Sequence, residues 1–238
     1  NNFKIVFFLS TILRLVSPAL LVGIDDGTGE STRQVLRRLL SVRSVKTLRH
    51  VRQLSAPAGA AARQEAVEAL GGTRATLAVE ELALALDDVA PAVREAAARS
   101  LGEIGDPRAI PALGAKLCDP AAGIGETAAG ALARIGDPAA TPWLVAAIRG
   151  PDGGVRIAAM RALAALRDPA AAPALVDSLD PAHQTRTETA CAALAALAPK
   201  MASEDVQNAL PRLLALLDPD VGRGVRLAAA VVWERFAE

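Results

Sequence analysis

The chain has 238 residues, of which 52% are hydrophobic, and its equal numbers of acidic and basic side chains give a formal net charge of zero. That length is enough to bury a large apolar surface. Only two cysteines are present, which fits a reducing compartment rather than a disulfide-stabilised class. The charge is unevenly placed, because residues 1–54 carry nine Lys or Arg and three Asp or Glu, whereas residues 55–238 carry 17 and 23.

Residues 5–24 are an apolar run whose one charged residue is Arg14. At about 1.5 Å of rise per residue, a helix of this length crosses a hydrocarbon core of roughly 30 Å. We therefore expect a transmembrane helix. A signal peptide, with an apolar region of about 7–15 residues, and a soluble or interfacial helix are the alternatives. A central charge costs about 2.5–3.5 kcal/mol on insertion, so we expect Arg14 to face other helices.

The apolar run from Phe3 to Leu15 resembles the last transmembrane helix of major facilitator superfamily transporters, some of which carry repeat domains after it. The resemblance implies that residues 1–24 end a truncated membrane region. The first residue, Asn1, is not a methionine, which also predicts a fragment. No transporter signature loop is present, so the resemblance assigns no substrate-binding residue.

Residues 25–54 are expected to form a polar linker and then a basic amphipathic helix over residues 31–54. Apolar side chains return at helical spacing from Val35 to Val51. Two interpretations stay open: the helix docks on the first repeat, or it contacts anionic lipid. The second predicts membrane-surface binding by six cations, namely Arg37, Arg38, Arg43, Lys46, Arg49 and Arg52.

The same cations predict orientation. Lys and Arg gather on the cytoplasmic side of a span, so we expect everything after residue 24 to be cytoplasmic, at the inner or plasma membrane. Nucleic acid is not an expected partner, because residues 55–238 are net acidic and lack aromatic stacking platforms.

A repeat with a period of 31 residues organises residues 55–238. Its clearest members are leucines at this spacing: Leu70, Leu101, Leu132, Leu163 and Leu194. A fixed period near 30 is typical of a solenoid. Each unit predicts two helices separated by a stop-and-start signal such as Gly105-Asp106-Pro107, where glycine ends one helix and aspartate caps the next. In the unit at 119–148, glycines 123, 125 and 130 are each expected to weaken a helix.

These residues resemble the HEAT repeat family in its short form with a Gly-Asp-Pro turn. The resemblance is carried by Val93-Arg94, by residues 101–107 and by residues 110–113, and it covers roughly residues 55–238. It implies an all-α fold, an α-solenoid of stacked antiparallel helix pairs. Such repeats also occur in phycobilin lyases, but the repeat is shared more widely than that activity.

No catalytic constellation is visible in the sequence, and we expect no metal and no cofactor. His50 and His183 stand alone in different segments, and Cys118 and Cys191 lie 73 residues apart. Trp143 and Trp233 are expected to fill the core or an end of the array. Arginines and aspartates at equivalent repeat positions, such as Arg94 and Asp106, are expected to form caps and inter-repeat pairs.

Three classes of function follow. The first is a non-catalytic, membrane-tethered scaffold that binds a protein through the concave face of the repeats. The second is the regulatory tail of a transporter-like membrane protein. The third is a lyase, or a lyase chaperone, that acts on a protein-bound chromophore; it requires a reactive cluster that the sequence does not display.

Overall fold

The computed structural model describes residues 59–73 and 78–237 of the chain. Every regular element within these ranges is a helix, which confirms the all-helical solenoid. The predicted segments 5–24 and 31–54, with Arg14 and the six surface cations, lie outside the ranges that the structure describes. Within those ranges, no helix is long and apolar enough to cross a membrane.

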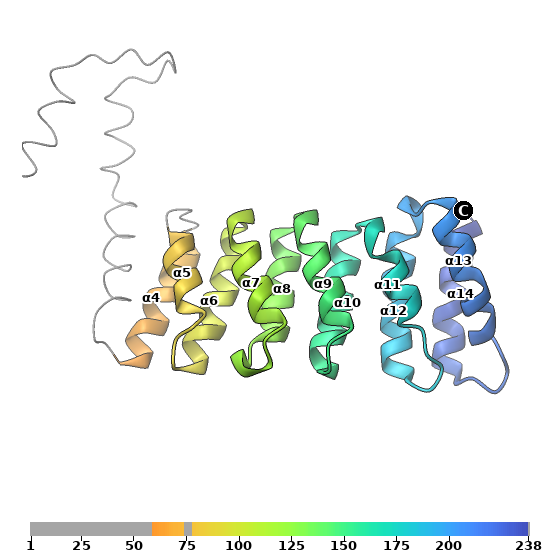
Figure 1. The fold of residues 1–238 in the computed structure, drawn as a ribbon, viewed down its shortest axis with the longest axis horizontal. Helices are drawn as coiled ribbons and strands as arrows, with labels where there is room; N and C mark the ends of the chain where they lie inside the picture. Colours follow the sequence, from red (N-terminus) through yellow and green to blue (C-terminus); the bar gives the residue numbers. More distant parts are fainter. Residues whose placement is uncertain (1–58, 74–77, 238) are drawn as a thin grey trace, which may run out of the picture. The chain divides into compact units, whose positions relative to one another are not determined.

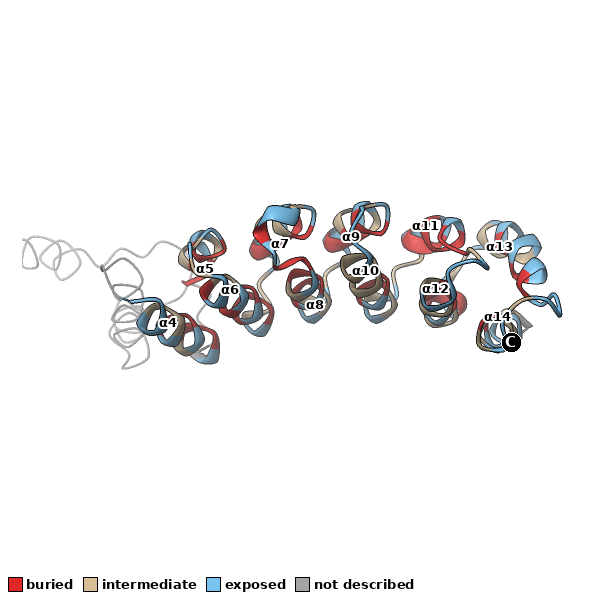
Figure 2. Cartoon of the chain, turned by 90° about the horizontal axis from the view of Figure 1, so that it is seen from below, coloured by how far each residue is buried: buried red, intermediate tan, exposed pale blue. Residues whose placement is uncertain are grey.

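The helices form two layers, one from the first helix of each pair and one from the second (Figure 1, Figure 2). The first layer contains α4 (Ala60–Thr73), α6 (Pro91–Ile104), α8 (Gly125–Ile135), α10 (Gly153–Leu166), α12 (Gln184–Leu197) and α14 (Arg223–Ala237). The second contains α5 (Val79–Ala85), α7 (Ile110–Leu117), α9 (Thr141–Ile148), α11 (Ala172–Asp177) and α13 (Ser203–Leu216). Each first-layer helix contacts the next one, so neighbouring pairs share one continuous core.

The 31-residue spacing identifies the residues at the centre of this core. All five leucines of the series have no exposed surface: Leu70, Leu101, Leu132, Leu163 and Leu194. Small residues beside them let the helices approach closely, since a Cβ at Gly102 would lie only 2.8 Å from the Cα of Ala131. The predicted register is therefore confirmed.

The turn inside three of the described pairs differs in detail from the prediction. Asp106 does act as a cap, and its Oδ1 accepts a hydrogen bond of 2.9 Å from the backbone N–H of Arg108. What begins there is a 3₁₀ turn, η2 (Pro107–Ala109), which leads into α7. The turn recurs as η4 (Pro138–Ala140) and η5 (Pro169–Ala171). Proline suits the first position of each turn because no amide hydrogen is needed there.

The expectation about glycines is wrong for two of the three. Gly123, at φ +66°, ends the turn η3 (Pro120–Ala122) and lies outside the helix. Gly125 is the first residue of α8, and a Cβ there would come within 2.6 Å of a Val155 methyl group. Gly130 alone sits inside α8 with open space around it. The unit therefore carries one helix-weakening glycine, and the other two are required by the local geometry.

Candidate functional site

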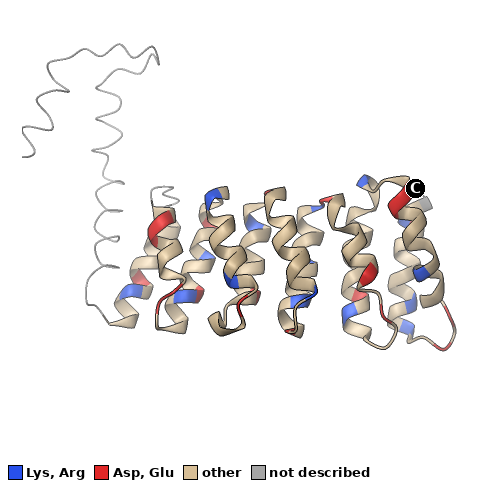
Figure 3. Ribbon diagram, in the orientation of Figure 1, with Lys and Arg blue, Asp and Glu red and all other residues tan. Residues whose placement is uncertain are grey.

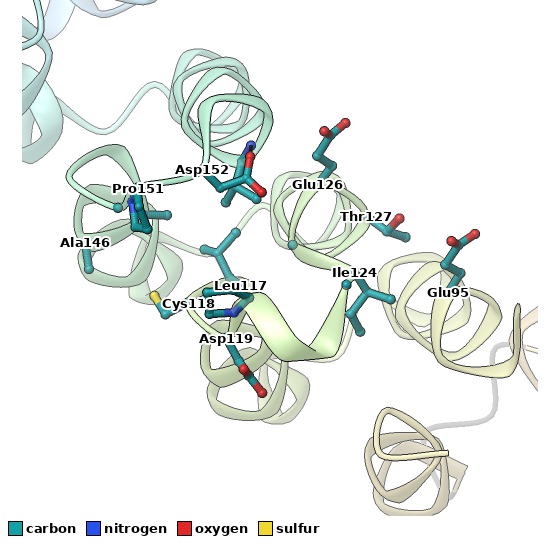
Figure 4. Close-up of a pocket in the computed structure, with 16 residues that line it drawn as sticks. Glu95, Leu117, Cys118, Asp119, Ile124, Glu126, Thr127, Ala146, Pro151 and Asp152 are labelled. Atoms are coloured by element: carbon teal, nitrogen blue, oxygen red, sulfur yellow. Dashed lines mark hydrogen bonds between the residues drawn. The ribbon is translucent and has the colours of Figure 1, made fainter. Parts of the chain in front are cut away.

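A cavity of about 320 Å³ opens on the edge of the array where one helix pair connects to the next. Its walls come from two successive connections, residues 118–124 and 149–152, and from the first turns of α8 and α10 (Figure 4). We call this cavity the junction pocket. Its volume is at the lower end of the range of roughly 300–1,000 Å³ that is common for ligand pockets.

Apolar side chains line the interior of the junction pocket. Leu117 ends α7 and Ile124 precedes α8, and both are buried. Ala147 comes from the end of α9, and half-buried Val155 comes from the first turn of α10. Gly125 lets Val155 pack this closely, since a side chain at position 125 would collide with it. The interior is therefore built by three consecutive helix pairs, and its shape depends on how they stack.

Four of the residues that line the pocket carry carboxylates, namely Glu95, Asp119, Glu126 and Asp152. Asp119 and Asp152 cap local structure: Asp119 Oδ1 accepts a bond of 2.9 Å from the Ala121 amide, and Asp152 Oδ1 accepts one of 2.8 Å from the Gly154 amide. Glu95 and Glu126 are exposed, and neither has a hydrogen-bond or ion-pair partner within residues 59–73 and 78–237. Two of the four carboxylates are thus uncommitted.

Two arginines of the repeat hold the connections in place. Arg94 donates from Nε to the Ala122 carbonyl at 3.0 Å and from Nη1 to the Asp88 carbonyl at 2.9 Å. Arg156 donates from Nη1 to the Gly150 carbonyl at 2.9 Å. Arg94 thus bonds to the connections on both sides of it, whereas Arg156 bonds only within its own connection. In the described structure neither arginine forms an ion pair with an aspartate, so the expected inter-repeat pairs are not seen at these two positions. Both guanidinium groups bond to backbone carbonyls, and neither arginine lines the pocket.

Acidic residues recur along the same edge of the array (Figure 3). Every connection from a second-layer helix to the next first-layer helix contains at least one aspartate, as at Asp88, Asp119, Asp152, Asp180 and Asp218. Arg149 is an exposed cation in one of these connections, but it does not line the junction pocket. The pocket therefore sits within a row of loops that each contain an aspartate, although Asp88 is paired with Arg63 and Asp87 with Lys116.

The two cysteines occupy opposite environments. Cys118 is exposed and lines the junction pocket, whereas Cys191 is buried inside α12. Burial, with a smaller contribution from the charge of Glu188, raises the pKa of the Cys191 thiol to about 12. His183 lies in another connection, where its Nδ1 is 2.9 Å from Asp180. The pocket therefore brings a thiol near carboxylates but places no histidine beside it.

The structure separates the remaining candidate residues. Trp143 is half-buried and packs against the core, while Trp233 is 40% exposed at the C-terminal end of the described array. His50 falls outside the described ranges. Within those ranges, no group of three or more His, Cys, Asp or Glu residues could hold a metal ion.

The sequence-based site residues did not include Glu95 and Glu126. The spacing could have identified them, since they lie 31 residues apart at equivalent positions of consecutive repeats. What the spacing does not disclose is the cavity beside them, because that depends on loops of different composition.

Comparison with known proteins addresses the fold. The family model for HEAT repeats matches residues 48–124 and 115–195, which together make up more than half of the chain. This chain belongs to the HEAT repeat family. A search of curated proteins found no match to this HEAT repeat chain.

Solved structures of designed armadillo repeat proteins resemble it in fold. A designed armadillo repeat protein in complex with the peptide (KR)4 is 22% identical, covers 79% of this chain and 98% of its own, and has a TM-score of 0.58. Another designed armadillo repeat protein is 21% identical over the same shares, with a TM-score of 0.54. The complex of CpcE and CpcF of phycocyanin lyase from Nostoc sp. PCC7120 is 22% identical, with a TM-score of 0.42, over 79% of this chain and 94% of that one.

Proposed function

We propose that this HEAT repeat chain is a non-catalytic scaffold that binds a protein partner, and that the junction pocket anchors the partner. The observation that carries the proposal is the pocket itself. It is an open cavity with an apolar interior and uncommitted carboxylates, assembled by three consecutive helix pairs. Ligand sites typically combine an apolar lining with a few convergent polar groups.

The repeat architecture supports the same proposal. Stacked repeats present extended surfaces that are suited to binding other chains. The peptide (KR)4 bound to a designed armadillo neighbour shows that one protein of related fold takes a peptide. A partner on the concave face remains part of the proposal, with the junction pocket adding an anchor on the loop edge. The pocket thiol has no histidine beside it, which favours binding over nucleophilic chemistry.

The membrane tether is a second part of the proposal, and it rests on sequence alone. Residues 5–24 would span the inner or plasma membrane and residues 31–54 would lie on its anionic cytoplasmic surface, as in the regulatory tail of a transporter-like protein. Changing Arg37, Arg38 and Arg43 to Glu should release the protein from anionic vesicles without unfolding the repeats. Labelling of a cysteine introduced after Leu54 from outside intact cells would contradict the topology.

Cross-linking from Cys118 tests the scaffold function. Cys118 is exposed and Cys191 is buried, so a thiol-reactive photo-cross-linker attaches at the pocket selectively. We expect it to join a defined polypeptide from an extract of the source cells, and excess unlabelled protein should compete. The matched control is Cys118→Ser combined with Glu204→Cys, which moves the cross-linker to an exposed position on α13. Identical products from both positions, or none from Cys118, would contradict the proposal.

A further inference from the structure

We infer that the junction pocket binds a lysine- or arginine-bearing segment of the protein partner, a specificity that rests on the proposed scaffold function. The segment would place one long basic side chain inside the cavity and further cations along the acidic loop edge. Three features of the pocket argue for this occupant. They are its apolar interior, its carboxylates without ion-pair partners, and the bonding of Arg94 and Arg156 to backbone carbonyls.

The apolar interior suits the aliphatic part of a lysine or arginine side chain. Such side chains bury their methylene groups along apolar surface and keep the charged group at the polar boundary. Leu117, Ile124 and Val155 supply that surface, and four carboxylate-bearing residues belong to the same lining. An acidic side chain would meet like charges there, and a purely apolar one would leave those carboxylates without partners.

The carboxylates have unused acceptor capacity. Glu95 and Glu126 accept no hydrogen bond from any described residue. Asp119 and Asp152 use only Oδ1 in their caps. A guanidinium group offers five N–H donors and pairs well with carboxylates. A cationic side chain therefore gains charge-assisted hydrogen bonds here, and the existing loop caps are undisturbed.

The dispersion of the carboxylates argues against a metal ion as the occupant. A metal needs several ligands converging on one point, and no such group exists in the part of the chain that the structure describes. The four carboxylates come from separate positions on α6, the 118–124 loop, α8 and the 149–152 loop. Oxygens of Glu126 and Asp152 lie beside the same point at Gly154, whereas Glu95 and Asp119 stand apart from them (Figure 4). An extended segment with several cations can reach these three places separately.

The protein's own cations are not arranged to fill the pocket. Arg94 and Arg156 bond to the backbone carbonyls of Ala122 and Gly150, and Arg149, which lies within the second connection, does not line the pocket. Withdrawing either guanidinium to pair with Glu95 or Glu126 would leave those carbonyls without their donors. The negative charge at the pocket is therefore available to a partner.

Peptide binding to the full chain in neutral detergent provides the test. The probe is a fluorescent (Lys-Arg)4 peptide, and its neutral control replaces each cation with glutamine. We expect the basic peptide to bind, to slow alkylation of Cys118, and to bind more weakly at high salt. The double variant Glu95→Gln/Glu126→Gln should bind the basic peptide about tenfold more weakly. It loses two exposed ion pairs, and each such pair changes the affinity by no more than about fivefold.

A charge-matched variant separates the pocket from general electrostatics. Glu65→Gln/Glu234→Gln removes two exposed glutamates from the first layer, far along the chain from the pocket, and should bind like the unmodified protein. Equal losses in both variants, or equal binding of the neutral peptide, would overturn the inference. If the basic peptide does not bind but Cys118 still cross-links a partner, the basic-segment inference fails and the scaffold function stands. If neither occurs, both fail.

Discussion

The contact between Gly114 and Trp143 joins two consecutive second-layer helices. A Cβ at position 114 would lie 2.7 Å from Cε3 of the Trp143 ring and closer still to two other ring atoms, so it would collide with the ring. We therefore expect Gly114→Ala to lower the free energy of unfolding by about 1–3 kcal/mol, the usual cost of overpacking. Chemical denaturation followed by circular dichroism measures it. Combining it with Trp143→Ala should recover part of the loss relative to the sum of the single changes.

Gly130 offers the opposite prediction from the same substitution. It lies inside α8, it is exposed, and a Cβ there would meet nothing within 4 Å. Gly130→Ala should raise the free energy of unfolding by about 0.5–1 kcal/mol, because alanine loses less backbone entropy in a helix. A destabilised Gly130→Ala protein in the same denaturation assay would show that the surroundings of α8 are tighter than described.

Cys191 predicts a loss of stability at alkaline pH. Its folded pKa of about 12 lies above its ordinary value near 9, so the folded state keeps a proton that the unfolded chain releases. The contribution of the Cys191 thiol to the free energy of unfolding is unchanged below pH 9. It falls as the pH rises from 9 toward 12, by up to about 1.4 kcal/mol per pH unit. Urea unfolding at pH 8, 9 and 10 should show a shallower decline for Cys191→Ala than for the unmodified protein. Cys118→Ala, which changes an exposed thiol, should not alter the slope.

At the scale of the elements, Asp-Pro turns connect the two helices of a pair, and the aspartate caps each turn. Asp137 Oδ1 accepts a bond of 2.8 Å from the Ala139 amide and caps η4, with no other partner in the described structure. Asp137→Ala should therefore cost about 0.5–2 kcal/mol of stability, the usual cost of losing a cap. Asp137→Asn keeps the oxygen acceptor and should unfold close to the original midpoint. If both variants lose the same amount of stability, the charge of Asp137 matters and its capping oxygen does not.

The sequence pattern predicted the elements better than their boundaries. Gly105 and Gly136 end helices in the left-handed conformation, as a Gly-Asp-Pro signal implies. Arg167 takes the same conformation at the end of α10, where no glycine marks it. The 3₁₀ turns and the exclusion of Gly123 from a helix depend on loop geometry, which hydrophobic spacing does not encode. The junction pocket lies in those same loops, so the site was less predictable than the core.

At the scale of the whole array, each helix pair is supported by its neighbours. The repeat position that Leu101 occupies shows this support. Leu132 occupies this position in the middle of the array and is completely buried. Trp233 follows Val225 by the same eight residues that separate Leu101 from Val93, yet it is 40% exposed. In the described structure no further helix pair packs over α14, so its equivalent position stays partly open.

This difference predicts unequal costs for truncating equivalent side chains. Leu132→Ala should lower the free energy of unfolding by about 2–5 kcal/mol, because it leaves a cavity in the shared core. The loss in the free energy of unfolding caused by Trp233→Ala should be smaller than the 3–5 kcal/mol that is usual for a buried tryptophan, because part of the Trp233 surface is already exposed. Denaturation midpoints measure both, and Leu84→Ala, at a side chain that is 76% exposed, serves as the surface control. A near-zero effect of Leu132→Ala would refute the 31-residue register on which the whole fold depends.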